Sequence, residues 1–537
     1  MIKQNTIPKG WKETILGEVA EKIFSGGTPD TRISKYWDGT LNWLSSGETG
    51  KKFIFDTKKK ISKEGVKESS TKLADENYVV IAIAGQGNTR GQVSLLKIKS
   101  YINQSVIAID SKKNESDNIW LFYNLSSRYS ELRFVSESNS IRGSLTTQIL
   151  KNLKILLPPL PEQKAIAAVL SSFDDKIELL REENKTLESI AQTIFKEWFV
   201  KFNFPCLPEN YEFSGAHKPD DFDSVCTYQA VGGLPAPQKE KYFLYVLLCS
   251  DKSFYIGITE NLYKRWYEHK KAQGAKWTKG KKPLKVIHWE EYTSRTEVCK
   301  REKWLKTGFG RKWLKREYNA GRLRQAGKMV NSELGEIPEG WKVGGLIEKD
   351  ISDFVKTNID IFDGEKDYIE TANVDFSEFV GNFEKITYNE RPSRANMQPV
   401  ANSFWFARMS KSRKFLLFLN RDKLNLKTKI LSTGFAGIQC IREYLYFYWN
   451  FILSNSFNDC KNQYAEGAVQ VAISNSGIQR ILLVIPPKNI ARNFANSTEP
   501  LFEKISNNNM QIQTLSSIRD TLLPKLIKGE IRVKFNG

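Results

Sequence analysis

Two long stretches of the chain place mostly apolar residues at spacings of four and three, the pattern of a coiled-coil seam, with one gap of seven in the second stretch. The first series is Phe173, Ile177, Leu180, Asn184, Leu187, Ala191, Ile194 and Trp198, and the second is Leu501, Ile505, Asn508, Ile512, Leu515, Leu522 and Leu526. The pattern predicts two long helices that pack on each other, with Asn184 and Asn508 fixing their register. The alternative is that each helix packs only on its own globular half.

The segments before the two helices carry short apolar runs broken by Gly, Asn and Asp, which is typical of strands separated by turns. Such runs lie at 78–83 and 106–109 within residues 13–157, and at 404–407 and 481–485 within residues 343–485. We therefore expect a β-rich globular domain before each long helix.

The chain repeats itself around an insertion. Ile7-Pro8-Lys9-Gly10-Trp11-Lys12 recurs at 337–342 with one change, and the run ending in Pro158-Pro159 recurs as one ending in Pro486-Pro487. Further matches at one offset are Lys176-Ile177 with Lys504-Ile505, Thr186-Leu187 with Thr514-Leu515, Ser189-Ile190 with Ser517-Ile518, and Thr193 with Thr521. A constant offset indicates a duplication. If a pseudo-two-fold axis relates the copies, the two helices pack antiparallel.

The insertion has a pattern of its own. Residues 205–240 are rich in Pro, Gly and Asp and are predicted to be a linker. After them we expect strands at 242–248, 254–258 and 284–292, a basic helix at 261–271 and a helix at 296–306. Because the insertion follows the first long helix, its two ends should lie close together if the helix pair is to remain intact.

Length and charge narrow the class of protein. A chain of 537 residues is too long for one hydrophobic core, so three or more domains are expected. The formal net charge is +20, and residues 241–318 alone hold 20 Lys and Arg against 8 Asp and Glu. This excess favours a polyanionic partner such as nucleic acid, with a solvated basic surface as the alternative. The six scattered cysteines and the lack of a signal-peptide or membrane-spanning pattern predict a cytoplasmic protein.

The duplicated arrangement resembles the specificity subunit of a type I restriction-modification system. The strings that carry the resemblance are Leu156-Leu157-Pro158-Pro159-Leu160-Pro161-Glu162-Gln163-Lys164, Thr521-Leu522-Leu523-Pro524-Lys525-Leu526-Ile527-Lys528-Gly529-Glu530-Ile531, Ser25-Gly26-Gly27-Thr28-Pro29, Asn103-Gln104 and Asn396-Met397-Gln398-Pro399-Val400. The resemblance implies an α+β multidomain fold. Two β-rich, mixed α/β target-recognition domains would be joined by an antiparallel coiled coil, which sets the spacing between two DNA half-sites.

The same resemblance implies partners: double-stranded DNA, methyltransferase subunits that carry S-adenosylmethionine, and a motor-nuclease subunit that uses ATP. The chain has neither an amino-methyltransferase motif nor a phosphate-binding loop of its own. Candidates for DNA contacts lie on polar loops, and the alternative for each is a solvated surface side chain. They are Gln86, Asn88, Arg90, Arg391, Arg394, Lys411, Arg413 and Lys414.

Residues 241–320 resemble a small GIY-YIG nuclease domain. The first motif is altered to Leu244-Tyr245-Val246 but keeps its tyrosine, whereas the second, Tyr255-Ile256-Gly257, is intact. Arg265, His269, Glu302 and Lys306 match the remaining polar positions of the family. The resemblance implies that Glu302 binds Mg²⁺ and Arg265 the scissile phosphate, that Tyr245 or Tyr255 activates water, and that His269 assists proton transfer. The alternative makes both tyrosines core residues and Glu302 the ion-pair partner of Lys306.

These expectations divide the chain into seven segments. They are a recognition domain at 1–155, a spacer helix at 156–204, a linker at 205–240, the nuclease-like domain at 241–320, a linker at 321–336, a second recognition domain at 337–485 and a second spacer helix at 486–537. Three functions follow: a specificity subunit with an added nuclease, a self-contained site-specific nuclease, or a DNA-binding scaffold with an inactive relic.

Overall fold

The computed structural model describes residues 7–85, 89–137, 144–202, 204, 220–221, 225–226, 230, 234–235, 237–320, 323, 329–381, 383–467 and 471–533. The candidates Gln86 and Asn88 lie outside these residues. By its internal contacts the chain divides into two units, Met1–Glu182 with Met510–Gly537 and Glu183–Asn509. Within the described part of the chain, no helix combines the length and apolar content that crossing a bilayer requires.

The globular domain of the first unit is built on two sheets, with strand orders β2-β10-β7-β8-β4 and β5-β3-β9-β6. Strand β7 is buried on both faces, because Val79 and Ile81 join one core cluster and Val80 joins another. The strands are β2 (Ala20–Ser25), β3 (Leu41–Leu44), β4 (Phe53–Ile54), β5 (Lys59–Ile61), β6 (Lys72–Ala74), β7 (Val79–Ala82), β8 (Val93–Leu96), β9 (Ser100–Ile102) and β10 (Val106–Ser111). The helices of this domain are α1 (Leu16–Val19), α2 (Lys63–Lys67), α3 (Asn118–Ser126), α4 (Tyr129–Glu137) and α5 (Thr147–Lys151).

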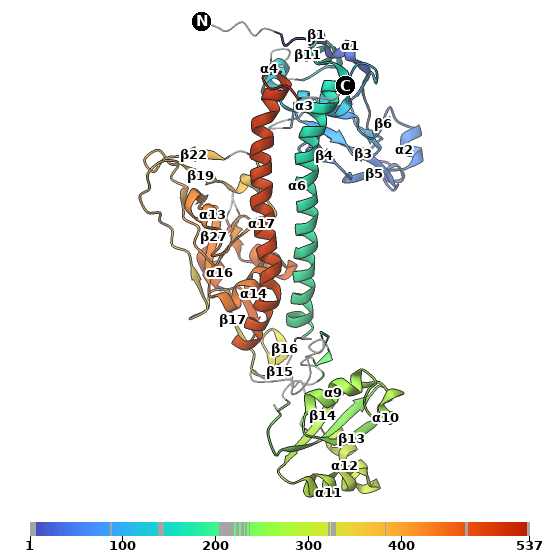
Figure 1. Cartoon of the computed structure of the whole chain (residues 1–537), viewed down its shortest axis with the longest axis vertical. Helices are drawn as coiled ribbons and strands as arrows, with labels where there is room; N and C mark the ends of the chain where they lie inside the picture. The colour runs from blue at the N-terminus through green and yellow to red at the C-terminus, as the bar shows by residue number, and fades with distance from the viewer. Residues whose placement is uncertain are drawn as a thin grey trace. The chain divides into compact units, whose positions relative to one another are not determined.

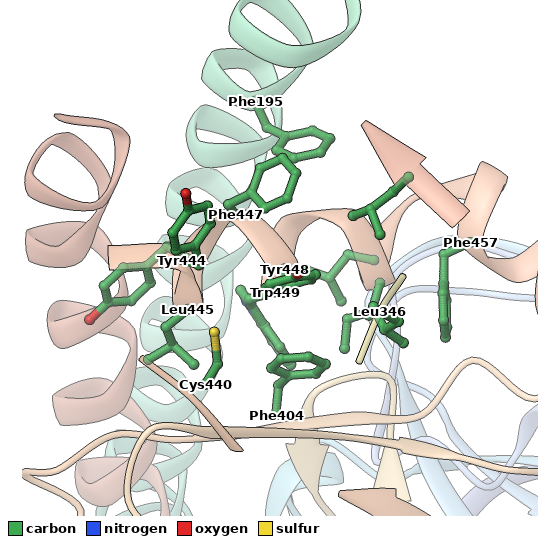
Figure 2. Packing of buried hydrophobic residues seen from close by; sticks show 14 of the residues in the cluster. Phe195, Leu346, Phe404, Cys440, Tyr444, Leu445, Phe447, Tyr448, Trp449 and Phe457 are labelled. Carbon is green, nitrogen blue, oxygen red and sulfur yellow. The ribbon is translucent and has the colours of Figure 1, made fainter. Parts of the chain in front are cut away.

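The globular domain of the second unit also has two main sheets, with orders β18-β27-β24-β25 and β22-β19-β26-β23. Its strands include β18 (Ser352–Phe354), β19 (Lys366–Ile369), β22 (Glu384–Ile386), β23 (Ala395–Met397), β24 (Ser403–Ala407), β25 (Phe415–Phe418), β26 (Lys429–Ser432) and β27 (Phe435–Cys440). Its helices are α13 (Lys423–Thr428), α14 (Arg442–Leu453), α15 (Asn455–Gln463) and α16 (Asn475–Gln479). Figure 2 shows aromatic side chains of α14 packed around Phe404 and Phe195, and the Phe404 ring stacks on Tyr448 with centroids 5.9 Å apart.

The duplicated sequence forms the same frame in each unit. Strand β1 (Lys12–Ile15) pairs antiparallel with β11 (Lys154–Leu157), and β17 (Lys342–Gly345) pairs antiparallel with β30 (Leu482–Ile485). Lys12 lies opposite Leu157 in the first pair, and Lys342 lies opposite Ile485 in the second. The matching ends of each copy thus meet in one two-stranded sheet, and each sheet leads into a long helix.

The long helices α6 (Leu160–Phe195) and α17 (Lys488–Ile527) pack antiparallel in both units (Figure 1). In the first unit, Ile177 and Leu180 pack against Ile512 and Leu515. In the second unit, Asn184 donates a 2.8 Å hydrogen bond to Asn509, and Asn508 donates one of 2.9 Å to Asn184. The predicted antiparallel pairing and its asparagine layer are confirmed.

Both spacer helices are shorter than predicted. Residues 156 and 157 belong to β11, and α6 begins only after Pro158 and Pro159, since a residue that precedes proline is disfavoured in the helical region. The first helix ends its regular α turns at Phe195 and continues as a π-helical turn over Lys196–Val200. The second begins at Lys488, after a proline pair that follows β30.

The inserted domain is a three-stranded antiparallel sheet of order β13-β12-β14 with helices on it (Figure 1). Its elements are β12 (Tyr242–Cys249), β13 (Phe254–Thr259), α9 (Leu262–Lys270), α10 (Lys276–Lys279), β14 (Pro283–Tyr292), α11 (Arg295–Lys306) and α12 (Gly308–Asn319). The three strands and the two helices predicted from sequence are present, and α10 and α12 are additional. Phe243, Tyr245 and Leu247 face the α9 side, whereas Leu244 and Val246 face the core cluster that contains Val298 and Leu314.

Parts of both predicted linkers belong to folded structure. In the range 205–240, Cys226, Ala230 and Leu234 are buried in the core beside α9, and the Trp266 indole donates to the Val225 carbonyl. In the range 321–336, Leu323 is buried in the other core of the insert. The hairpin of β15 (Met329–Ser332) and β16 (Gly335–Pro338) then follows. The linker assignments were wrong at these residues because scattered apolar positions gave no periodic signal.

The two ends of the insertion meet one hydrophobic cluster. Phe204, on the side that leads into the insertion, packs on Trp341 with ring centroids 5.1 Å apart. Met329 and Val330, on the side that leads out, pack against the cluster that contains Phe204 and Trp341. This common anchor brings the ends together, as the intact helix pair requires.

Candidate nuclease site

Tyr245 lies in the middle of the central strand of the insert. It is buried in β12 and pairs across the strands with Gly257 of β13. A Cβ atom at position 257 would lie 2.6 Å from the Tyr245 hydroxyl oxygen, well inside van der Waals contact. The glycine of the second motif is therefore the residue that leaves room for the tyrosine of the first.

The Tyr245 hydroxyl is hydrogen-bonded to His269. The Tyr245 oxygen lies 2.7 Å from Nε2 of His269, and Nδ1 of the same ring lies 2.8 Å from Oγ1 of Thr278. The Thr278 hydroxyl donates its own proton to the Ala275 carbonyl, so it accepts from Nδ1. The histidine consequently carries its proton on Nδ1, and Nε2 accepts the proton of the Tyr245 hydroxyl.

The electrostatics of the pair follow from burial. Burial, assisted by the charge of Arg265, lowers the pKa of His269 to about 4. Burial also raises the pKa of Tyr245; nearby Tyr255 reinforces this rise and Arg265 opposes it. At neutral pH the resting site thus contains a neutral imidazole with a free lone pair and a protonated phenol. That combination passes a proton from oxygen to nitrogen without first ionising either group.

Arg265 and Tyr255 complete the surroundings of the phenol. Nε of Arg265 donates to the Tyr245 oxygen over 3.3 Å, and Nη1 pairs with Glu268 at 2.6 Å. The Tyr255 ring packs edge-on against His269 with centroids 4.9 Å apart. Both predicted tyrosines are thus in contact with His269, but only the Tyr245 hydroxyl is hydrogen-bonded to it.

Glu302 and Lys306 lie one turn apart on α11 and form the ion pair of the alternative interpretation. Nζ of Lys306 donates to Oε1 of Glu302 over 2.7 Å. The neighbouring Arg301 pairs with Glu290 of β14 at 2.9 Å, and this contact anchors α11 on the sheet. Among the described residues there is no group of three or more His, Cys, Asp or Glu that could hold a metal. One partly exposed carboxylate still fits Mg²⁺, which completes its shell with waters and phosphate oxygens.

The DNA-contact candidates of the recognition domains occupy different environments. Arg90 is only 8% exposed and pairs with Glu137. The Arg391 guanidinium lies over the Tyr388 ring, 4.0 Å from its centroid. Arg413 donates to Asn455 and to the Leu453 carbonyl, and Lys414 donates to the Thr371 carbonyl. Arg394 and Lys411 have exposed side chains.

Comparison with known proteins identifies both parts of the chain. Residues 8–189 match the family described as type I restriction modification DNA specificity domain, and residues 241–319 match the GIY-YIG catalytic domain. The type I restriction enzyme MjaIX specificity subunit of Methanocaldococcus jannaschii is 24% identical over 533 residues, which cover 98% of this chain and 95% of that protein. The chain belongs to the type I specificity subunits and carries an inserted GIY-YIG domain.

The chain is also similar to a shorter curated protein and to a solved structure. The UPF0213 protein of Limosilactobacillus reuteri is 46% identical over 69 residues, which are 12% of this specificity subunit and 72% of that protein. A crystal structure of a type I restriction-modification S subunit from M. genitalium covers 98% of this chain and 97% of that chain, with 11% identity and a TM-score of 0.43. The resemblance seen in the sequence to both families is confirmed by the family matches.

Sequence reasoning missed three residues of the inserted site in this specificity subunit. Thr278 sets the histidine tautomer, and Gly274 leaves room for His269, since a Cβ there would lie 2.5 Å from Nδ1. Trp277 packs beside Tyr255, with ring centroids 5.7 Å apart. All three lie between the predicted basic helix and the third strand. The sequence signal at this place was a lone Gly274-Ala275-Lys276-Trp277-Thr278 string with no periodicity.

Proposed function

We propose that this specificity subunit reads a bipartite DNA site and that its inserted domain hydrolyses a DNA phosphodiester bond. The observation that carries the nuclease part is the hydrogen-bonded chain from Arg265 through Tyr245 and His269 to Thr278. A neutral histidine that accepts from a phenol beside an arginine can move a proton next to a bound phosphate, which fits a nuclease. The two recognition domains share the strand pair at their ends but differ in the sequence between those ends. This supports recognition of a bipartite site, because each domain can recognise a different half-site.

The proposed chemistry starts from a protonated Tyr245 and a neutral His269. A water molecule attacks the phosphorus while Tyr245 removes a proton from it, and the phenol proton passes to Nε2 of His269. The bond from phosphorus to one deoxyribose oxygen breaks at the same time, and the leaving oxygen takes a proton from solvent. Arg265 lies on the Tyr245 oxygen and is placed to stabilise the negative charge that gathers on the phosphate. When bound by Glu302, Mg²⁺ would supply further charge neutralisation at the phosphate. Lys306 forms an ion pair with Glu302, and its ammonium group is free to exchange this partner for a phosphate oxygen.

The duplicated helices support the proposal that two copies of a methyltransferase subunit dock on this chain. Ile190 of α6 and Ile518 of α17 occupy matching positions of the repeat, next to Ser189 and Ser517. Each is a large apolar side chain that remains exposed, at 44% and 42%. Equivalent apolar positions on equivalent helices fit two copies of one partner. S-adenosylmethionine would be bound by those subunits and ATP by a motor-nuclease subunit, and the assembly would work in the cytoplasm.

Plasmid cleavage tests the nuclease part. Purified protein with Mg²⁺ should nick supercoiled plasmid, and Glu302→Ala should lower the rate by about 100-fold or more through loss of the metal ligand. Glu297→Ala, at an exposed position of the same helix, is the matched control and should cleave like the unchanged protein. If the unchanged protein leaves plasmid intact with Mg²⁺, the domain is an inactive relic and the nuclease proposal is wrong.

Co-purification tests the specificity part. The chain expressed with its methyltransferase should form a stable complex that protects a bipartite DNA sequence from nuclease digestion. Cleavage at a defined site by the chain alone, together with failure to retain a methyltransferase, would instead identify a self-contained site-specific nuclease.

A further inference from the structure

A basic groove runs beside the candidate nuclease site. The groove has a volume of about 1120 Å³ and includes Tyr255 and Lys306 of that site in its wall. Its cationic lining residues are Lys252, Lys281, Lys306, Arg311 and Lys315, and none of the residues that line it, all within the described stretch 237–320, is acidic. Lys281 and Lys306 have carboxylate partners outside the lining, Asp251 and Glu302. A wall of this charge is suited to a phosphate backbone.

Arg311 and Lys315 give the groove a row of cations on one helix face. They lie one turn apart on α12, both side chains are exposed, and both line the groove. Residues spaced by four on a helix point to the same side, so the two cations can contact successive phosphates of one strand. Lys252, also exposed, lies in the turn between β12 and β13 and lines the groove as well.

Trp277 adds an aromatic surface to this groove. Its side chain is 42% exposed, with Nζ of Lys281 over the ring at 4.2 Å and the Tyr255 ring beside it. Burying an indole is strongly favourable, so an exposed one next to cations indicates a surface that a ligand covers. A nucleic-acid base is a flat ring that stacks on tryptophan, and cations beside it take the phosphates.

We propose that this groove binds a single, unpaired DNA strand, with one base stacked on Trp277 and its backbone along Arg311, Lys315 and Lys306. The faces of paired bases inside a duplex are covered by the neighbouring base pairs, so only an unpaired base can stack on the indole of Trp277. The inserted domain therefore acts on locally unpaired DNA. This inference rests on the proposed nuclease function for its consequence, although the binding itself is tested without cleavage.

The test is a binding assay on the full chain in EDTA, which prevents metal-dependent cleavage. A fluorescein-labelled oligo-dT strand is the probe, and a mixed-sequence duplex of the same length is the comparison. Trp277→Ala should weaken binding of the single strand by about tenfold, as loss of one stacked base does, and leave duplex binding unchanged. Trp277→Phe should restore most of the loss. Trp304→Ala removes a tryptophan of the same domain that is 41% exposed and outside the groove, and should have no effect.

A cleavage assay with Mg²⁺ separates the two proposals. Duplexes with a central mismatched stretch should be cut faster than fully paired ones, and Trp277→Ala should remove that preference. Trp277-dependent binding of the single strand without any cleavage would defeat the nuclease function and leave the groove assignment in place. Equal loss of binding in Trp277→Ala and Trp304→Ala, no loss in either, or duplex cleavage that ignores Trp277 would overturn the groove assignment.

Discussion

The Tyr245 hydroxyl and Nε2 of His269 are 2.7 Å apart in the core of the inserted domain, and the histidine is neutral there. This relationship links the two halves of the proposed chemistry. A tyrosine with a raised pKa stays protonated at neutral pH and cannot accept a proton, whereas a tyrosine that donates its proton to a neutral imidazole can deprotonate water in one concerted step.

The pH dependence of cleavage follows from the lowered pKa of His269. Because the folded-state pKa is about 4, the imidazole stays neutral as pH falls from 6.5 and becomes protonated only as pH drops through about 4. We expect the acid limb of kcat/KM for DNA cleavage to lie well below pH 6.5. A limb centred near 6.5 would contradict the buried, neutral histidine.

Substitution of Gly257 should disable the site without unfolding the domain. The Cβ of Gly257→Ala would lie 2.6 Å from the Tyr245 hydroxyl oxygen and must displace it from His269. We expect a loss of cleavage rate of about 100-fold, as for other misplacements of a reacting group, with an unchanged circular dichroism spectrum. Gly280→Ala is the matched control because a Cβ there meets nothing within 4 Å.

Thr278 should control the histidine tautomer. Thr278→Val keeps the shape but removes the acceptor of the Nδ1 proton, so the ring is free to place its proton on Nε2, where it opposes proton transfer. Cleavage should fall by about tenfold or more, the usual effect of removing the partner that orients a histidine. Thr278→Ser retains the hydroxyl and should restore the rate. Equal rates for valine and threonine would exclude this role.

Asp174 should be a stabilising residue of the first unit. It is 2% exposed and accepts from Lys52 at 2.6 Å and from Arg519 at 2.6 Å, which joins the recognition domain to both helices. Asp174→Ala leaves the largely buried cations without their carboxylate and should lower the free energy of unfolding by about 3–5 kcal/mol. Thermal unfolding measures this loss. The neighbouring Asp175→Ala, at an exposed position, should have little effect.

The two exposed isoleucines of the repeat should act separately. Ile190→Glu and Ile518→Glu each place a charge on an apolar docking position, so each should lower the number of bound methyltransferase subunits from two to one. The double variant should bind none. Native mass spectrometry of the co-expressed complex reports the stoichiometry. Two bound subunits in the double variant would show that the methyltransferase docks at other residues.

Features that depend on spacing along one chain could be predicted from the order of residues alone. Heptad positions such as Ile177 and Ile512 identified both helices, since every residue of a seam faces the same partner. The constant offset between the copies revealed the duplication. The GIY-YIG residues Tyr245, Arg265 and Glu302 were identifiable because their residue types and order are typical of that family.

The contacts between side chains that are distant in the chain became visible only in the folded domain. The tautomer of His269 depends on Thr278, and the space for Tyr245 depends on Gly257, a contact across two strands that no local pattern encodes. The groove that Trp277 shares with Arg311 and Lys315 is likewise formed by separate elements. Hydrogen bonds and close packing act over a few ångströms in space, so residues that are unremarkable in the sequence gain a role only when folding brings them together.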